Sequence, residues 1–130
     1  MAFRFFSKRK PLEKSVSSEL PEITAEEREG LHEKLEVLKQ TLKDGEDLAD
    51  KYEQIGLTYS KLGDDDKAIE NLEKSLEVLP SIGDGYKVLM SLYNKKRADS
   101  ARSGDDNGID YYMNKMDDMR QIAKITTLKR

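Results

Sequence analysis

Residues 52–80 read YEQIGLTYSKLGDDDKAIENLEKSLEVLP, and this stretch contains the clearest structural pattern in the chain. In its first half, bulky apolar and aromatic side chains recur at steps of three or four residues and then stop at Gly63, which predicts one face of a helix. In its second half, Ala68, Leu72 and Leu76 form a similar stripe between three aspartates and Pro80. Because only a few residues separate the stripes, we predict an antiparallel helical hairpin.

Similar stripes on both sides of this hairpin predict three further helices. A capping box at Thr24-Ala25-Glu26-Glu27 begins the first, and Asp44-Gly45 ends it. A second hairpin follows residue 83, and we expect its first helix to extend past Ala98. We interpret Asp105-Asp106-Asn107-Gly108 as a turn with a helix cap, since a calcium loop needs a bidentate Glu that is missing here.

The predicted fold class is therefore all-α, a short solenoid of antiparallel helical hairpins with about five helices. The predicted domain organisation is a mobile N-terminal segment and linker over 1–22, a helical domain over 23–124, and a frayed tail over 125–130.

Composition narrows the functional classes. The chain has 130 residues, of which 38% are charged and 36% hydrophobic, so one modest domain is expected. The absence of cysteine excludes disulfides and thiolate chemistry and suits a reducing cytosol, and a single histidine leaves little for acid–base or metal chemistry. We find no nucleophile–base pair, phosphate loop or metal spacing, and so predict a non-enzyme without cofactor or metal. A net charge of −3 disfavours nucleic acid as a partner.

The hairpin pattern resembles the tetratricopeptide repeat family, whose consensus is W-x2-L-G-x2-Y, then A-x3-F, then P. Residues 49–80 match it as one good repeat, and residues 83–124 resemble a divergent one with Met90 in place of the glycine. The first helix resembles the second half of a repeat and would act as a cap. The positions that match the consensus of the good repeat are Tyr52, Ile55, Gly56, Tyr59, Ala68, Leu72 and Pro80.

The resemblance implies an interaction module whose ligand lies on the concave face formed by the first helix of each pair. A lysine and asparagine clamp for a C-terminal carboxylate is not expected, because Glu53 and Leu57 stand at the clamp positions. An ordinary solvated helix surface remains the competing interpretation. The groove residues that the alignment implies are Asp50, Glu53, Leu57, Ser60, Lys61, Asp84, Lys87, Ser91, Asn94 and Lys95.

The N-terminal end of the chain is basic and rich in phenylalanine, unlike the rest of the sequence. Residues 1–14 contain five basic residues and one acidic residue, a net charge of +4. Aromatic side chains beside cations suit an anionic membrane surface or an acidic partner, although a plain disordered tail is the alternative. The residues concerned are Phe3, Arg4, Phe5, Phe6, Lys8, Arg9 and Lys10.

Solenoids of this kind generally need about three stacked units, and this chain is short of that number. We therefore expect either polar outer caps or an open C-terminal end that forms a homodimer or docks a partner, through Tyr111, Tyr112, Met116 and Met119. The function predicted from the sequence is a cytoplasmic protein–protein interaction module, an adaptor or scaffold that binds a protein or peptide. The alternative is a membrane-peripheral assembly or tethering factor.

Overall fold

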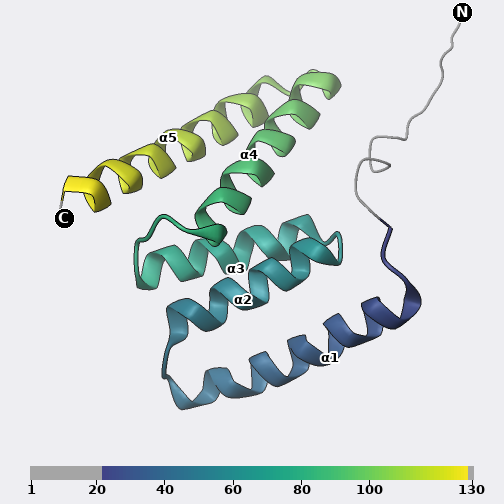
Figure 1. Ribbon diagram of the computed structural model, residues 1–130. Helices are drawn as coiled ribbons and strands as arrows, with labels where there is room; N and C mark the ends of the chain where they lie inside the picture. Colours follow the sequence, from purple (N-terminus) through teal and green to yellow (C-terminus); the bar gives the residue numbers. More distant parts are fainter. Residues whose placement is uncertain (1–21, 129–130) are drawn as a thin grey trace, which may run out of the picture. The chain divides into compact units, whose positions relative to one another are not determined.

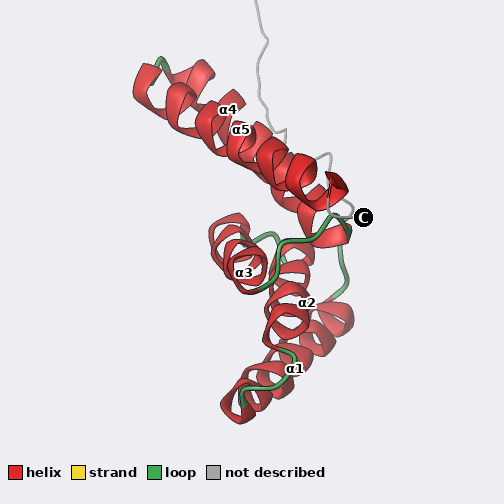
Figure 2. Cartoon of the chain, turned by 90° about the vertical axis from the view of Figure 1, so that its left-hand side faces the viewer, coloured by secondary structure: helices red, strands yellow, loops and turns green. Residues whose placement is uncertain are grey.

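The computed structural model describes residues 22–128, and within them the chain is helical apart from its turns (Figures 1 and 2). These residues contain five α-helices and no β-strand, which confirms the predicted all-α class. The elements are α1 (Ala25–Thr41), a 3-10 helix η2 (Leu42–Asp44), α2 (Leu48–Lys61), α3 (Asp65–Val78), α4 (Asp84–Ser103) and α5 (Asp106–Leu128).

The chain divides into two units between Gly30 and Leu31. In the first unit, the start of α1 has the predicted capping box. The amide of Thr24 donates to Glu27 Oε1 at 2.8 Å, and the amide of Glu27 donates to Thr24 Oγ1 at 3.0 Å. Two amides that the helix itself leaves without partners are thereby satisfied.

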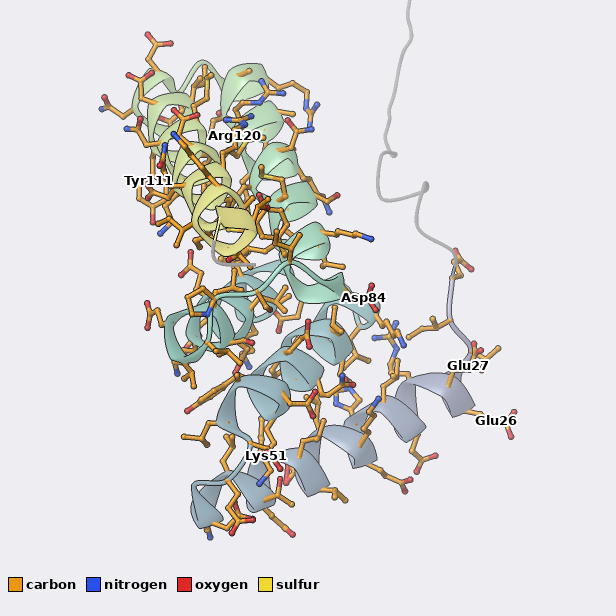
Figure 3. The ribbon with its side chains drawn as sticks, turned by 60° about the vertical axis from the view of Figure 1, so that its left-hand side comes forward. Glu26, Glu27, Lys51, Asp84, Tyr111 and Arg120 are labelled. Atoms are coloured by element: carbon orange, nitrogen blue, oxygen red, sulfur yellow. The ribbon has the colours of Figure 1, made fainter. Side chains whose placement is uncertain are left out.

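In the second unit, the predicted glycine stop is present at the end of the first helix. Gly45 has a φ of 73°, a left-handed conformation that favours glycine. The Nζ atom of Lys51, at the junction of α1 and α2 (Figure 3), donates to the Thr41 carbonyl at 2.9 Å and to Asp44 Oδ1 at 2.7 Å. The hydrogen bond from Lys51 holds the pKa of the Asp44 carboxyl below its usual value. The positive charge of Lys51 thus lies beside the carbonyl groups at the C-terminal end of α1, where it interacts favourably with the helix dipole.

Helices α2 and α3 form the predicted hairpin, and small residues allow them to approach closely. A Cβ atom added to Gly56 would lie 2.6 Å from Leu72 Cγ, which leaves no room for a side chain there. Ala68 on α3 is fully buried. The buried hydroxyl of Ser75 donates to the Ala49 carbonyl at 2.7 Å and joins the C-terminal half of α3 to the first turn of α2.

Helices α4 and α5 form a second, longer hairpin. As predicted, α4 extends past Ala98 and ends at Ser103, after which Gly104 has a φ of 74° and turns the chain. Asp105 Oδ1 accepts a hydrogen bond from the Gly108 amide at 3.0 Å. Asp105 therefore caps the N-terminus of α5, as predicted for the stretch Asp105-Asp106-Asn107-Gly108.

The two hairpins share one hydrophobic core. Helix α4 packs against both α3 and α2, and its Leu89 and Tyr93 side chains are buried between the hairpins. The buried apolar side chains are Leu35, Ile55, Tyr59, Ala68, Leu72, Leu76, Leu89, Leu92, Tyr93 and Met119.

The structure corrects three expectations at the C-terminal end. Met119, which we assigned to an open docking end, is 3% exposed, and the carbonyl of this residue accepts a hydrogen bond from the Tyr86 hydroxyl at 3.0 Å. The helical spacing of Met113, Met116 and Met119 predicts that all three face inward, but Met113 is 51% exposed. Helix α5 continues to Leu128, beyond the predicted end of the helical domain at residue 124. Met119 is buried because α5 packs against α4.

Candidate functional site

A hollow of about 440 Å³ lies on the face that α2 and α4 share, and we call it the α2–α4 hollow. Asp84, where α4 begins, marks its position in Figure 3. Five of the predicted groove residues are brought together here, namely Leu57, Ser60, Lys61, Asp84 and Lys87. The other residues that line the hollow are Lys34, Gln54, Thr58 and Val88.

Helical spacing explains why these side chains share a face. On α2, Gln54, Leu57 and Lys61 follow one another at steps of three and four, and on α4 Lys87 and Val88 lie three and four residues after Asp84. The Thr58 hydroxyl donates to the Gln54 carbonyl at 2.7 Å, and Thr58 is only 2% exposed. Its polar group is therefore satisfied within the helix, and the floor of the hollow presents mainly apolar surface.

The charges around the hollow are unequal. Lys34, Lys61 and Lys87 surround it, against a single carboxylate, Asp84. All three lysines are exposed, and none forms an ion pair with another residue of the described range 22–128. The hollow is thus a mildly cationic surface with apolar contacts from Leu57 and Val88.

Glu53, which we assigned to the groove, contacts the start of α4. Its Oε2 atom accepts a hydrogen bond from the Gly85 amide at 2.8 Å. A carboxylate at a helix N-terminus satisfies an otherwise unpaired amide and interacts favourably with the helix dipole. A Cβ atom added to Gly85 would lie 2.7 Å from Glu53 Oε2, so glycine permits this approach. Glu53 does not line the hollow, and its contact joins the two hairpins.

Lys95 also has a partner within the fold. Its Nζ atom lies 2.7 Å from Asp65 Oδ2, and the neighbouring Lys96 lies 2.7 Å from Asp66 Oδ1. The hydrogen bond to Asp66 raises the pKa of Lys96. Both pairs connect α4 to the first turn of α3, where carboxylates suit the helix dipole.

The remaining predicted groove residues lie outside the hollow. Asp50, Ser91 and Asn94 are exposed, and the Asn94 Oδ1 atom accepts a hydrogen bond from Arg97 Nε at 3.2 Å. The basic and aromatic residues predicted to contact an anionic surface, residues 3–10, lie outside the described residues.

Sequence reasoning missed Lys34, Gln54, Thr58 and Val88. Three of them could have been predicted from residues that were assigned to the groove. Gln54 lies one turn before Leu57, Thr58 lies one turn before Lys61, and Val88 directly follows Lys87. Lys34 comes from α1, and no local period of the sequence indicates which side chains of that helix meet α2.

Residues 22–128 contain neither a helix suited to cross a membrane nor a side-chain cluster suited to bind a metal ion. None of the described helices has both the length and the apolar composition that a membrane crossing requires. Within the same range, no three carboxylate or imidazole groups gather where they could bind a metal ion.

Comparisons with protein-family models, with curated proteins and with solved structures found no match for this chain.

Proposed function

We propose that this chain is a non-catalytic protein–protein interaction module, an adaptor or regulatory scaffold, whose hairpins stack as tetratricopeptide-like repeats. The observation that carries the proposal is the α2–α4 hollow, where five residues that the repeat alignment implies as ligand contacts lie together. The burial of Ile55, Ala68 and Leu72, and the close approach of α2 and α3 at Gly56, support the repeat assignment.

The chemistry of the hollow favours a peptide segment that combines acidic and apolar side chains. Three lysines can meet carboxylates of the partner, and Leu57 and Val88 can contact its apolar side chains. Complementary charge of this kind contributes mainly to specificity and to the rate of association. Since Glu53 is turned away toward Gly85, it does not oppose an acidic ligand at this place.

Selection from a random peptide library tests this proposal on the full chain. We expect the selected peptides to be enriched in aspartate and glutamate. We further expect the double variant Lys61→Glu/Lys87→Glu to bind them about tenfold more weakly or worse, since reversing two charges removes attraction and adds repulsion. Isothermal titration calorimetry measures the effect.

The matched control is Lys74→Glu/Lys124→Glu, which makes the same charge change at exposed positions of α3 and α5 outside the hollow. Peptides without acidic enrichment, or equal affinities for the two double variants, would contradict the proposed site.

A second candidate function rests on the sequence of residues 1–14, with its net charge of +4 and three phenylalanines. We propose that this segment tethers the helical domain to an anionic membrane surface. Each basic residue near such a surface contributes roughly 1 kcal/mol, and phenylalanine adds burial at the interface.

Vesicle co-sedimentation tests the tether. We expect the full chain to sediment with vesicles that contain phosphatidylserine, and a chain that lacks residues 1–14 to remain in the supernatant. Neutral phosphatidylcholine vesicles are the control. Equal sedimentation of the two chains with the anionic vesicles would remove this candidate.

A further inference from the structure

A second hollow, of about 140 Å³, lies between α3 and α5 with α4 beneath it, and we call it the α3–α5 groove. Its floor is apolar: Leu76, Leu89 and Met119 are buried, and Ile122 is half-buried. None of the predicted site residues on α2 or α4 lines it. The lining residues are Glu73, Leu76, Glu77, Leu89, Tyr93, Lys115, Asp118, Met119 and Ile122.

The rim of this groove is acidic, in contrast to the α2–α4 hollow. Glu73, Glu77 and Asp118 surround it against one cation, Lys115. Glu73 is already held in place, because the Tyr93 hydroxyl donates to it and Lys115 Nζ lies 3.4 Å from it. Burial raises the pKa of Tyr93, so its hydroxyl remains a donor. Glu77 and Asp118 are exposed and form no ion pair with another residue of the described range.

Apolar surface continues from the groove along α5. Ile122 is followed one turn later by Ile125, which is 50% exposed, and Leu79 and Ile82 after α3 are 61% and 38% exposed. Figures 1 and 2 both place the C-terminal end of α5 near the connection between α3 and α4. From Lys115 to Ile125 the helix rises about 15 Å, enough for a short peptide segment to lie alongside.

We propose that the α3–α5 groove binds a segment of a partner protein that places an aromatic side chain next to lysine or arginine. The volume of the groove, about 140 Å³, is close to the roughly 150 Å³ of an apolar cavity that accommodates a benzene ring. The cations beside that ring would meet Glu77 and Asp118. Charge complementarity thus selects a basic segment here, whereas the α2–α4 hollow selects an acidic one.

A peptide with the sequence MAFRFFSKRKPLEK, which is that of residues 1–14, provides a probe of the required composition. We expect the fluorescently labelled peptide to bind the full chain in an anisotropy titration. We expect the double variant Glu77→Lys/Asp118→Lys to bind it at least tenfold more weakly. A peptide in which serine replaces the three phenylalanines should also bind at least tenfold more weakly than the original.

The matched control is Glu70→Lys/Asp117→Lys, which makes the same charge change on the same two helices, at exposed positions outside the groove. Equal affinities of the two double variants for the peptide, or no binding by the unaltered chain at millimolar concentration, would overturn the proposal. Circular dichroism of both variants checks that they remain folded. The acidic peptides of the first test should bind Glu77→Lys/Asp118→Lys unchanged, so that the two sites are judged separately.

Discussion

Replacing Leu72 with alanine is expected to lower the free energy of unfolding by about 2–5 kcal/mol, the range for leucine-to-alanine changes in a core. Leu72 is 1% exposed, and it fills the space in front of Gly56, where its Cγ atom would be 2.6 Å from an added Cβ. Alanine at this position would leave a cavity between α2 and α3. The two helices would have to move closer together to fill it. Urea denaturation followed by circular dichroism at 222 nm measures the loss.

Leu79→Ala is the matched control, since it removes the same atoms from a side chain that is 61% exposed. Its expected effect lies within about 0.5 kcal/mol of zero, as for most surface substitutions. Similar losses in the two variants would mean that Leu72 does not fill the space between the helices as described.

The second large effect is expected at Glu53. Replacing it with alanine should cost about 1.5–3 kcal/mol, the range for a hydrogen bond to a charged group, because the Gly85 amide at the start of α4 loses its acceptor. Glu53→Gln keeps an acceptor oxygen and should cost less, on the order of the 0.3–1 kcal/mol that a charge contributes at a helix end. Thermal and urea unfolding of both variants provide the measurement.

Glu70→Ala provides the comparison, because Glu70 is an exposed residue of α3 whose ion-pair partner is Lys74 one turn away. Its expected cost is no more than about 0.5 kcal/mol. If Glu53→Ala proved as stable as Glu70→Ala, the contact between α2 and the start of α4 would not hold the hairpins together.

The local structure could be predicted from the sequence because each element has its signal nearby. The period of apolar residues indicated the helices, the Thr24 and Glu27 pair indicated the first cap, and Gly45 and Gly104 mark the ends of helical segments. Each of these signals depends on residues within a few positions of one another, so tertiary packing does not override them.

The contacts between hairpins could not be predicted in the same way. Glu53 and Lys95 were both assigned to an open face from alignment with the repeat pattern. In the fold, each is drawn to the first turn of a neighbouring helix, at Gly85 and Asp65 respectively. A carboxylate at a helix N-terminus is favourable, and a lysine can pair with such a carboxylate. Which carboxylate and which lysine reach a given helix N-terminus depends on how the helices pack, and the local sequence does not encode this packing.

The candidate site was predicted in part. Leu57, Lys61 and Lys87 line the α2–α4 hollow as the repeat alignment implies, whereas Lys34 comes from a helix whose packing no local pattern encodes. Of the residues that line the α3–α5 groove, only Met119 was expected to dock a partner, because the acidic rim combines residues of two helices that are distant in the chain.

Nuclear magnetic resonance mapping tests the central claim, that the α2–α4 hollow is the binding surface, most directly. The full chain, labelled with ¹⁵N, would be titrated with an acidic peptide obtained from the library selection. We expect amide shifts to change along residues 54–61 and 84–88, and Lys61→Glu/Lys87→Glu to need at least about tenfold more peptide for the same changes. Shift changes confined to α5, or equal changes in that variant, would contradict the claim.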